Sequence, residues 1–406
     1  MIVPERARAW GRRIRPYAPM LVALALLWPF LSPPVYLGDH LTFWSAGHLA
    51  AQGGSPYDGD ALRATSREAA RTGIAIDPLP AGEYLVDWAY PPWTAFALVP
   101  FGALPVELGL PLLHLTFLAA AVAAFVAFAL AVPGPGPRPT ALGLLFGVLY
   151  QPMVITIRSG HFGGLLLAGA ALVLASLRTR RPVPLIAGAL LLSLKPQLAV
   201  GTAAVVAVVL VRERRYRDLV LASGTLVLLA TIAFAARPDA VQAMSTAFAE
   251  RFATRGSTVW TAVPAWLADP VLVGLLLAAT TALLCAAAVL RAGSADAPYV
   301  LFAASWVITL GVLPYAQQYD QVLLMPAMLF AVVAVEGIAR GRRAYLVWLT
   351  VTLVLVPWAL FLPTVSERVP VWSGFVPTVM ALVLLVATAR RPARIAAGTP
   401  ARAPAS

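Results

Sequence analysis

Long apolar runs constrain this chain more than any other feature of its sequence. Many of them are long enough for a helix to cross the hydrocarbon layer of a bilayer, which takes about 20 residues. Only helices and closed barrels satisfy their backbone hydrogen bonds in lipid. The chain is 60% hydrophobic and 12% charged, whereas about a quarter of the residues of a soluble protein are charged. We therefore predict an all-α polytopic membrane protein with about 11–13 membrane helices, some of them short or re-entrant.

Apolar and basic segments together predict the orientation of the chain. The apolar segments lie at 17–37, 90–104, 108–131, 140–157, 162–177, 183–193, 196–211, 218–236, 270–290, 298–313, 320–338, 345–362 and 372–388. Arginine clusters lie at 6–15, 178–181, 212–217, 340–343 and 390–394. Basic residues favour the cytoplasmic side, so we expect the N-terminus and all of these clusters to face the cytoplasm, with the protein in the plasma membrane.

This orientation defines one transmembrane domain, residues 1–389, with two large extracytoplasmic loops. The loops are 38–89 and 237–269, and a cytoplasmic tail, 390–406, is predicted to be disordered. Within the first loop, the pattern of 60–72 predicts an amphipathic helix lying along the membrane surface.

Two segments do not fit a simple alternation of crossings. Residues 90–104 are short and bracketed by prolines, so we expect this segment not to cross. Residues 183–211 lie between two arginine clusters, which predicts a short hairpin with Lys195 at its outer tip. A single kinked helix is the alternative reading of the same pattern.

Charge and composition exclude several classes of protein. The net charge of +12 is clustered beside apolar segments, which indicates membrane anchoring and not nucleic-acid binding. The single cysteine, Cys285, excludes a disulfide framework and a thiolate metal site. Four histidines on distant segments form no metal motif, so we expect neither a metal nor another cofactor. The chain shows no internal repeat, and this disfavours a transporter.

Asp39 is the first candidate for chemistry, because it follows the first apolar segment on the predicted outer face. A carboxylate there either caps a helix or takes a proton from a substrate hydroxyl. No second carboxylate lies at a fixed helical spacing from it. The sequence therefore proposes a single general base and no acid–base pair of carboxylates.

Three basic side chains are expected at the same face. Lys195, the only lysine, lies in an apolar context where an ammonium costs several kcal/mol unless an anion partners it; a lipid phosphate or a nearby aspartate would serve. Arg158 follows an apolar segment and either binds an anion or extends to the interface. His161 lies among glycines that let a ligand approach, although a polar turn is the simpler reading.

Short motifs in a fixed order resemble glycosyltransferase family 87 over roughly residues 20–340. They are Gly38-Asp39, Phe43-Trp44, Ala46-Gly47, Gly54-Ser55-Pro56-Tyr57, Tyr90-Pro91-Pro92-Trp93, Gly160-His161, Leu194-Lys195-Pro196 and the segment PYAQQYDQ. One motif departs from the pattern, since the family often has Gly-Gln followed by Asn where this chain has Gly160-His161 and then Gly163.

The resemblance implies a GT-C fold and a polyprenyl-phosphate sugar as donor, as in actinobacterial cell-envelope biosynthesis. Its best-studied members are α-1,2-mannosyltransferases of phosphatidylinositol mannosides and lipomannan, and related enzymes transfer arabinose. In such enzymes an aspartate of the first external loop is the catalytic base, a role that falls on Asp39. Lys195 matches the position of the family's Lys-Pro motif.

The expected function is therefore inverting transfer of a sugar, most directly mannose, to a hydroxyl of a lipid or lipid-linked glycan. Asp39 is the expected base. Lys195, Arg158 and His161 are expected to bind the donor phosphate. The residues expected to bind sugar or acceptor are His40, Trp44, Tyr57, Tyr90, Gln317 and Asp320. Arabinofuranosyl transfer, a flippase of lipid-linked sugars and a noncatalytic scaffold are the alternatives.

Overall fold

The computed structural model describes residues 17–31, 38–73, 88–133, 137–254, 268–313, 316–338, 340–359 and 374–390. Within these ranges the regular secondary structure is helical and includes no strand, which confirms the predicted all-α class. The N-terminal arginine cluster, parts of both predicted loops and the tail beyond residue 390 lie outside the described residues.

The first half of the chain forms α2 to α11. Their bounds are α2 Ala18–Leu31, α3 Gly38–Ala51, α4 Gly59–Ala70, α5 Pro92–Gly102, α6 Val106–Ala131, α7 Pro137–Leu149, α8 Gln151–Ser159, α9 Gly163–Thr179, α10 Pro182–Leu192 and α11 Pro196–Arg212. The second half forms α12 Tyr216–Ala236, α13 Ala240–Thr254, α14 Pro270–Arg291, α15 Ala297–Val312, η3 Gln318–Leu324, α16 Met325–Ala334, η4 Val335–Gly337, α17 Arg342–Thr350, η5 Val351–Leu355 and α19 Val376–Arg390.

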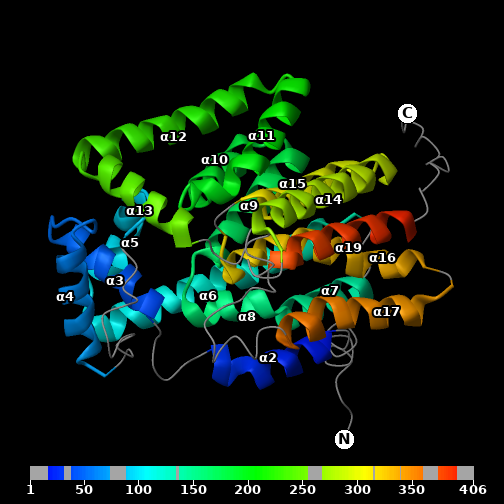
Figure 1. The fold of residues 1–406 in the computed structure, drawn as a ribbon, viewed down its shortest axis with the longest axis horizontal. Helices are drawn as coiled ribbons and strands as arrows, with labels where there is room; N and C mark the ends of the chain where they lie inside the picture. The colour runs from blue at the N-terminus through cyan, green and yellow to red at the C-terminus, as the bar shows by residue number, and fades with distance from the viewer. Residues whose placement is uncertain are drawn as a thin grey trace, which may run out of the picture.

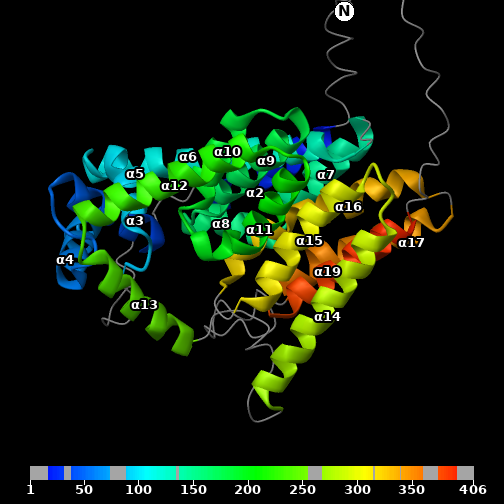
Figure 2. The same ribbon diagram turned by 90° about the horizontal axis from the view of Figure 1, so that it is seen from above.

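The molecule has two different ends. Helices α3, α4, α5 and α13 gather at one end, and α17 and the C-terminal end of α19 lie at the other (Figures 1 and 2). α3, α4 and α13 come from the two loops predicted to be extracytoplasmic. The elements between the two ends form the bundle of apolar helices.

Four helical spans among the described residues are long and apolar enough to cross a bilayer: α6, α12, α14 and the run Gln318–Gly337, with 26, 21, 22 and 20 residues. The bent pair formed by α7 and α8, with an angle of 57°, makes a fifth when taken as one span. Several further apolar helices have 10–17 residues. The expected 11–13 membrane helices require these shorter helices to cross as well, so that number stays a prediction.

The arginine clusters that flank α9 to α12 meet at one end of these helices. Arg180 and Glu213 form an ion pair with a distance of 3.9 Å, and Arg215 pairs with Asp218 at 2.7 Å. Arg178 donates to the carbonyl of Ala131, the last residue of α6. The clusters therefore share one side of the bundle, as the predicted orientation requires.

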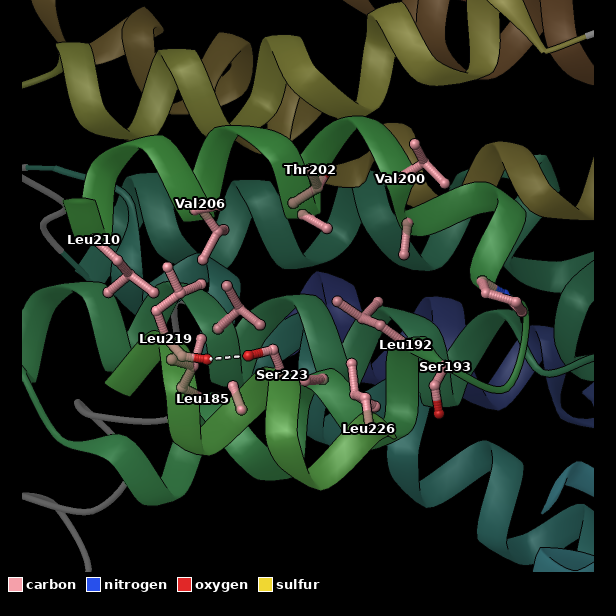
Figure 3. A pocket seen from close by; sticks show the side chains of 17 residues that line it. Leu185, Leu192, Ser193, Val200, Thr202, Val206, Leu210, Leu219, Ser223 and Leu226 are labelled. Carbon is pink, nitrogen blue, oxygen red and sulfur yellow. Dashed lines mark hydrogen bonds between the residues drawn. The ribbon is translucent and has the colours of Figure 1, made fainter. Parts of the chain in front are cut away.

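α10 and α11 form the expected hairpin and not a kinked helix. Leu185 and Leu210 lie together at one end of the pair, whereas Leu192 and Val200 lie at the other, so the two helices run antiparallel (Figure 3). Lys195 lies in the connection between them, at the end opposite to the arginines. The other irregular segment, α5, has 11 residues and is about 16 Å long, half of the hydrocarbon thickness of about 30 Å.

The amphipathic helix of the first loop forms, but its buried face is used differently from the prediction. Asp58 caps α4 by accepting from the backbone N–H groups of Asp60 and Ala61. The buried residues of α4 pack against α3, where Ser66 donates to Ser45 at 2.9 Å. We expected α4 to rest on lipid. Instead its buried face, made of small and apolar residues, packs against α3.

The core of the bundle surrounds α16. All of its residues are buried, as is expected for a helix that is apolar on every side. Tyr345 of α17 donates to the carbonyl of Ala331 at 3.0 Å. η3 leads directly into α16. The position of the η3 residues is therefore set by a helix that is buried along its whole length.

Small residues allow α9 and α10 to approach closely. A Cβ atom added at Gly188 would lie 2.7 Å from the carbonyl oxygen of Gly169, and one added at Gly169 would lie 2.9 Å from that of Gly188. Such backbone contact is a common way to pair helices in lipid, where apolar side chains gain little by leaving the solvent.

Gly188→Ala should therefore lower the stability of the protein in detergent by about 1–3 kcal/mol, the usual cost of overpacking. Gly224→Ala is the matched control, because a Cβ atom there meets nothing within 4 Å. Alanine favours a helix over glycine by about 1 kcal/mol, so the control should be neutral or stabilising. Thermal unfolding of both variants measures the difference, and equal shifts would contradict the close-packing account.

Candidate active site

Asp39 and His161 form a direct pair. Asp39 lies in the first turn of α3, and His161 is the middle residue of the three-residue connection, Gly160 to Phe162, that leads from α8 into α9. The Nε2 atom of His161 is 2.9 Å from Oδ2 of Asp39. The histidine side chain is 6% exposed and the Asp39 side chain is 37% exposed, so part of the aspartate remains accessible.

The environment of Asp39 keeps it ionised. Burial raises the pKa of its carboxyl, but the charge and hydrogen bond of His161 outweigh burial and leave the pKa below its ordinary value of 3.8; His40 and Lys195 add to the lowering. Because the folded pKa lies below the ordinary value, this contribution to stability is present above about pH 4 and disappears as the pH falls toward the folded pKa. A lower pKa weakens a base, so His161 reduces the basicity of Asp39 while fixing its position.

A second pair of histidines supports the first turn of α3. The Nε2 atom of His114 lies 2.6 Å from the carbonyl oxygen of Leu31 and must donate to it. Its Nδ1 atom therefore accepts from Nε2 of His40, at 3.0 Å. Burial, followed by the neighbouring His114, lowers the pKa of His40 to about 3. His40 is thus a neutral, buried ring that fixes the start of α3 and hence Asp39.

Gly160 allows the His40 ring to reach this position. Its φ of +73° is a left-handed conformation that costs a residue with a Cβ roughly 1–2 kcal/mol. A Cβ atom at Gly160 would also lie 2.4 Å from the His40 ring. The glycine before His161 is therefore required by both the turn and the close approach of α3.

Lys195 and Asp320 form a buried ion pair. The Nζ atom lies 2.6 Å from Oδ1 of Asp320, and the two side chains are 3% and 2% exposed. The other carboxylate oxygen accepts from the backbone N–H of Gln317 at 2.9 Å. The aspartate that could partner Lys195 is therefore present, and its burial differs from the position expected of a sugar ligand.

Tyr319 connects the two charged pairs. Its ring stacks on the ring of His161, and Nζ of Lys195 lies 5.0 Å from the centre of the same ring. Thr156 of α8 donates to the backbone carbonyl of Tyr319 at 2.8 Å. The expected meeting of Asp39, His161 and Lys195 thus occurs, with Tyr319 between the last two.

Arg158 brings a further positive charge to this site. It lies in the last turn of α8, and its charge acts on His40. Its Nη1 atom is buried and has no hydrogen-bond partner among the described residues. A buried N–H of a guanidinium needs an acceptor, so this atom could bind an anionic group of a ligand.

An apolar groove begins beside Lys195. It lies between α10, α11 and α12, has a volume of about 400 Å³, and is lined almost entirely by aliphatic side chains. Figure 3 shows its length, from Leu210 and Leu219 at one end to Ser193 at the other. Ser193 and Pro196, which lie on either side of Lys195 in the chain, line the groove, so one end of it lies near the charged site.

The other residues expected at the site lie further away. Trp44 stacks on His48 and packs in a separate cluster with Leu110. Phe43 lies between Tyr90 and His161, and its ring contacts both. The hydroxyl of Tyr57 donates to the backbone carbonyl of Tyr90 at 2.7 Å. Gln317 caps η3 in a box with Asp320.

Sequence reasoning missed Tyr319 and His114. Tyr319 belongs to the PYAQQYDQ segment, in which only its neighbours Gln317 and Asp320 were selected. His114 was not selected, although a histidine inside an apolar helix is a signal of function or of a specific partner. No group of three or more His, Cys, Asp or Glu side chains among the described residues could hold a metal ion.

These features define a polytopic helical membrane protein whose charged site lies at the helix ends opposite to its arginine clusters. The model of glycosyltransferase family 87 matches residues 88–314, over half of the chain. The protein belongs to this family and is a glycosyltransferase, which moves a sugar from a donor to an acceptor. The matched range contains Arg158, His161 and Lys195, whereas Asp39 and Asp320 lie outside it. No curated protein and no solved structure matches the chain.

His161→Gln should raise the pKa of Asp39. The amide of glutamine can still donate a hydrogen bond, but the attraction of the imidazole is lost and burial then acts with less opposition. Infrared titration of the carboxyl group, with Asp39→Asn as the reference spectrum, measures this pKa.

His48→Gln is the matched control for that titration. His48 lies on α3, as Asp39 does, but bonds to the carbonyl of Gly102 at 2.8 Å. The variant His48→Gln should therefore leave the pKa of Asp39 unchanged. An unchanged or lower Asp39 pKa in His161→Gln would refute the electrostatic role of His161.

Proposed function

We propose that the protein is an inverting GT-C-type transferase that moves mannose from a polyprenyl-phosphate donor to a hydroxyl of a lipid-linked glycan or glycolipid, forming an α-1,2 linkage. Asp39 is the general base. The reaction takes place on the extracytoplasmic side of the plasma membrane, with the N-terminus in the cytoplasm. The resemblance to polyprenyl-phosphate-mannose-dependent enzymes supports the choice of donor and sugar.

The pairing of Asp39 with His161 carries this proposal. One carboxylate oxygen is held at 2.9 Å by the ring, and the partly exposed carboxylate can turn its other oxygen toward a substrate. A base must be held within hydrogen-bond reach of the proton that it takes. Since the pKa of Asp39 lies below its ordinary value, the carboxylate is available to accept that proton at neutral pH.

The reaction follows from these positions. Asp39 takes the proton of an acceptor hydroxyl as its oxygen attacks the anomeric carbon of the donor sugar. The bond from that carbon to the phosphate breaks, and polyprenyl phosphate leaves with the electron pair. A single in-line displacement inverts the anomeric centre, so a β-linked donor gives an α-linked product.

Arg158, Lys195 and His161 bind the donor phosphate in this scheme. Negative charge develops on the phosphate as it leaves, and cations already in place stabilise that charge. The buried Nη1 of Arg158 lacks a partner among the described residues. Lys195 has three N–H donors, of which Asp320 engages one.

The apolar groove between α10, α11 and α12 accommodates the polyprenyl tail. A tail in a bilayer is already out of water, so the groove cannot gain much from the hydrophobic effect and must select by shape and packing. Its mouth at Ser193 and Pro196 adjoins Lys195. The tail and the phosphate of one donor molecule could therefore occupy both sites at once.

Asp39→Asn tests the function. Wild-type membranes should transfer sugar from polyprenyl-phosphate mannose to lipid acceptors, and the variant should be slower by roughly 10²–10⁴-fold, the size of a general-base contribution. Donor binding should persist, because Asp39 addresses the acceptor. Turnover and donor affinity are measured in parallel, together with thermal stability in detergent.

Polyprenyl-phosphate arabinose and GDP-mannose are the comparison donors in this assay. Transfer from polyprenyl-phosphate arabinose and not from polyprenyl-phosphate mannose would change the proposed sugar but not the proposed mechanism. Efficient transfer from GDP-mannose by the purified protein would exclude a lipid-linked donor. Full activity of a folded Asp39→Asn protein would end the single-base mechanism.

Lys195→Met should weaken donor binding and slow turnover, since it removes the ammonium but keeps an apolar stem. It should also cost about 3–5 kcal/mol of stability, because Asp320 is left as a buried, unpaired carboxylate. Asp320→Asn is the matched control: it breaks the same ion pair and keeps the ammonium.

Donor affinity separates the two explanations for Lys195. If the ammonium contacts the phosphate, Lys195→Met loses more affinity than Asp320→Asn at comparable stability. Equal donor affinity in both variants would assign Lys195 to structure alone.

A further inference from the structure

A second cleft lies between α4 and α13, outside the site described above. Its volume is about 530 Å³. The lining residues are Tyr57, Gly59, Arg63, Trp88, Asp239, Gln242, Ala243, Thr246 and Ala247. They come from both predicted extracytoplasmic loops and from the residue at which the chain returns toward α5. Figures 1 and 2 place α4 and α13 at the end of the molecule away from the C-terminus.

The two walls of the cleft are tied together at its base. Arg237, just before α13, donates to the backbone carbonyls of Gly53 and Gly54. Ser55 donates to Asp239 at 2.7 Å. These bonds join the connection between α3 and α4 to the start of α13. The cleft is therefore formed before any ligand enters, which reduces the cost of binding.

The lining of the cleft combines aromatic and polar groups. The Tyr57 ring is fixed by its hydrogen bond to Tyr90, and Trp88 also lines the cleft. The Gln242 side-chain amide has no hydrogen-bond partner among the described residues. A sugar presents an apolar face to rings and hydroxyl groups to amides, hydroxyls and charged groups, so this combination suits a sugar.

The charge of the cleft favours a neutral ligand. Arg63 forms an ion pair with Asp60 at 2.6 Å, and Asp239 adds a negative charge at the opposite wall. An anionic headgroup would meet a neutralised arginine and a carboxylate. This differs from the catalytic site, where Arg158 and Lys195 provide cationic groups for a phosphate.

A single ring separates the cleft from the catalytic pair. The centre of the Phe43 ring lies 6.1 Å from that of Trp88 and 6.2 Å from that of His161. A sugar in the cleft would therefore lie near a sugar at Asp39 but would not occupy the same place. This is the arrangement needed to bind two parts of one glycan.

We propose that this cleft binds the neutral glycan of the acceptor, holding the sugars that precede the one whose hydroxyl faces Asp39. The proposal rests on the transferase function and adds the acceptor class: a glycan of several sugars in place of a single-sugar lipid. α13 then determines how long an acceptor the enzyme prefers.

Filling the cleft tests the proposal. Ala243→Trp adds a large ring inside it, and Ser245→Trp adds the same ring on the same helix at an exposed position outside the lining. The acceptors are glycolipids of the membranes that show wild-type activity, separated by glycan length. Ala243→Trp should raise the KM for acceptors with several sugars by at least roughly tenfold and leave transfer to single-sugar acceptors within about twofold. Ser245→Trp should behave as wild type.

Gln242→Ala is a milder second variant, in case the tryptophan disturbs α13. Removing one or two hydrogen bonds to a sugar should raise the KM for long acceptors roughly 3–10-fold without changing kcat. Wild-type kinetics in both cleft variants, or a loss shared equally by short and long acceptors, would overturn the glycan cleft while leaving the transferase function intact. Absence of transfer by the wild-type protein from either lipid-linked donor would instead overturn the proposed function, and this inference with it.

Discussion

The buried ion pair of Lys195 and Asp320 is the interaction on which the arrangement of the site depends. Two side chains that are almost completely buried lie 2.6 Å apart, and removing either partner would leave an uncompensated charge at a cost of about 3–5 kcal/mol. The pair joins the tip of the α10–α11 hairpin to η3, and η3 leads directly into α16. It thereby fixes Tyr319, against which His161 stacks, and His161 in turn holds Asp39. A long-range electrostatic contact thus determines where the proposed base lies.

A membrane protein can hold such a pair because its bundle has two chemically different ends. The arginines that flank α9 to α12 pair with acids and bond to the end of a neighbouring helix at one end of the bundle. Asp39, His161 and the Lys195–Asp320 pair gather at the other end, where helices begin or turn. Placing charge at helix ends avoids the cost of ionised groups in the hydrocarbon layer. The same separation lets an apolar groove run between α10, α11 and α12 and end beside the charged site.

His161 has a coherent setting in the fold. The Asp39–His161 pair, the His40–His114 pair and Gly160 form one connected unit, since His40 occupies the space above Gly160 and lies next to Asp39 in the chain. Two histidines of the unit have different roles. The neutral His40 supports the start of α3, and His161 pairs with the Asp39 carboxylate. This unit keeps Asp39 in place beside His161.

The sequence by itself determined the all-α membrane class and the arginine end, because a helix crosses a bilayer according to the length of its apolar run and is oriented by its flanking charges, which are local properties. It favoured the α10–α11 hairpin but left a single kinked helix open, and the structure decided between them. The sequence also indicated Asp39, His161 and Lys195 as one site, since a resemblance in motif order carries spatial information. Only the tertiary structure decided that Asp320 pairs with Lys195, that Tyr319 lies between the pairs, and that Trp44 packs elsewhere. Likewise, the pattern of α4 predicted an apolar face but could not say whether lipid or α3 would cover it. Those outcomes depend on which side chains meet between separate elements, from 21 residues apart for Ser45 and Ser66 to 125 for Lys195 and Asp320. Periodicity and composition contain no information about such contacts.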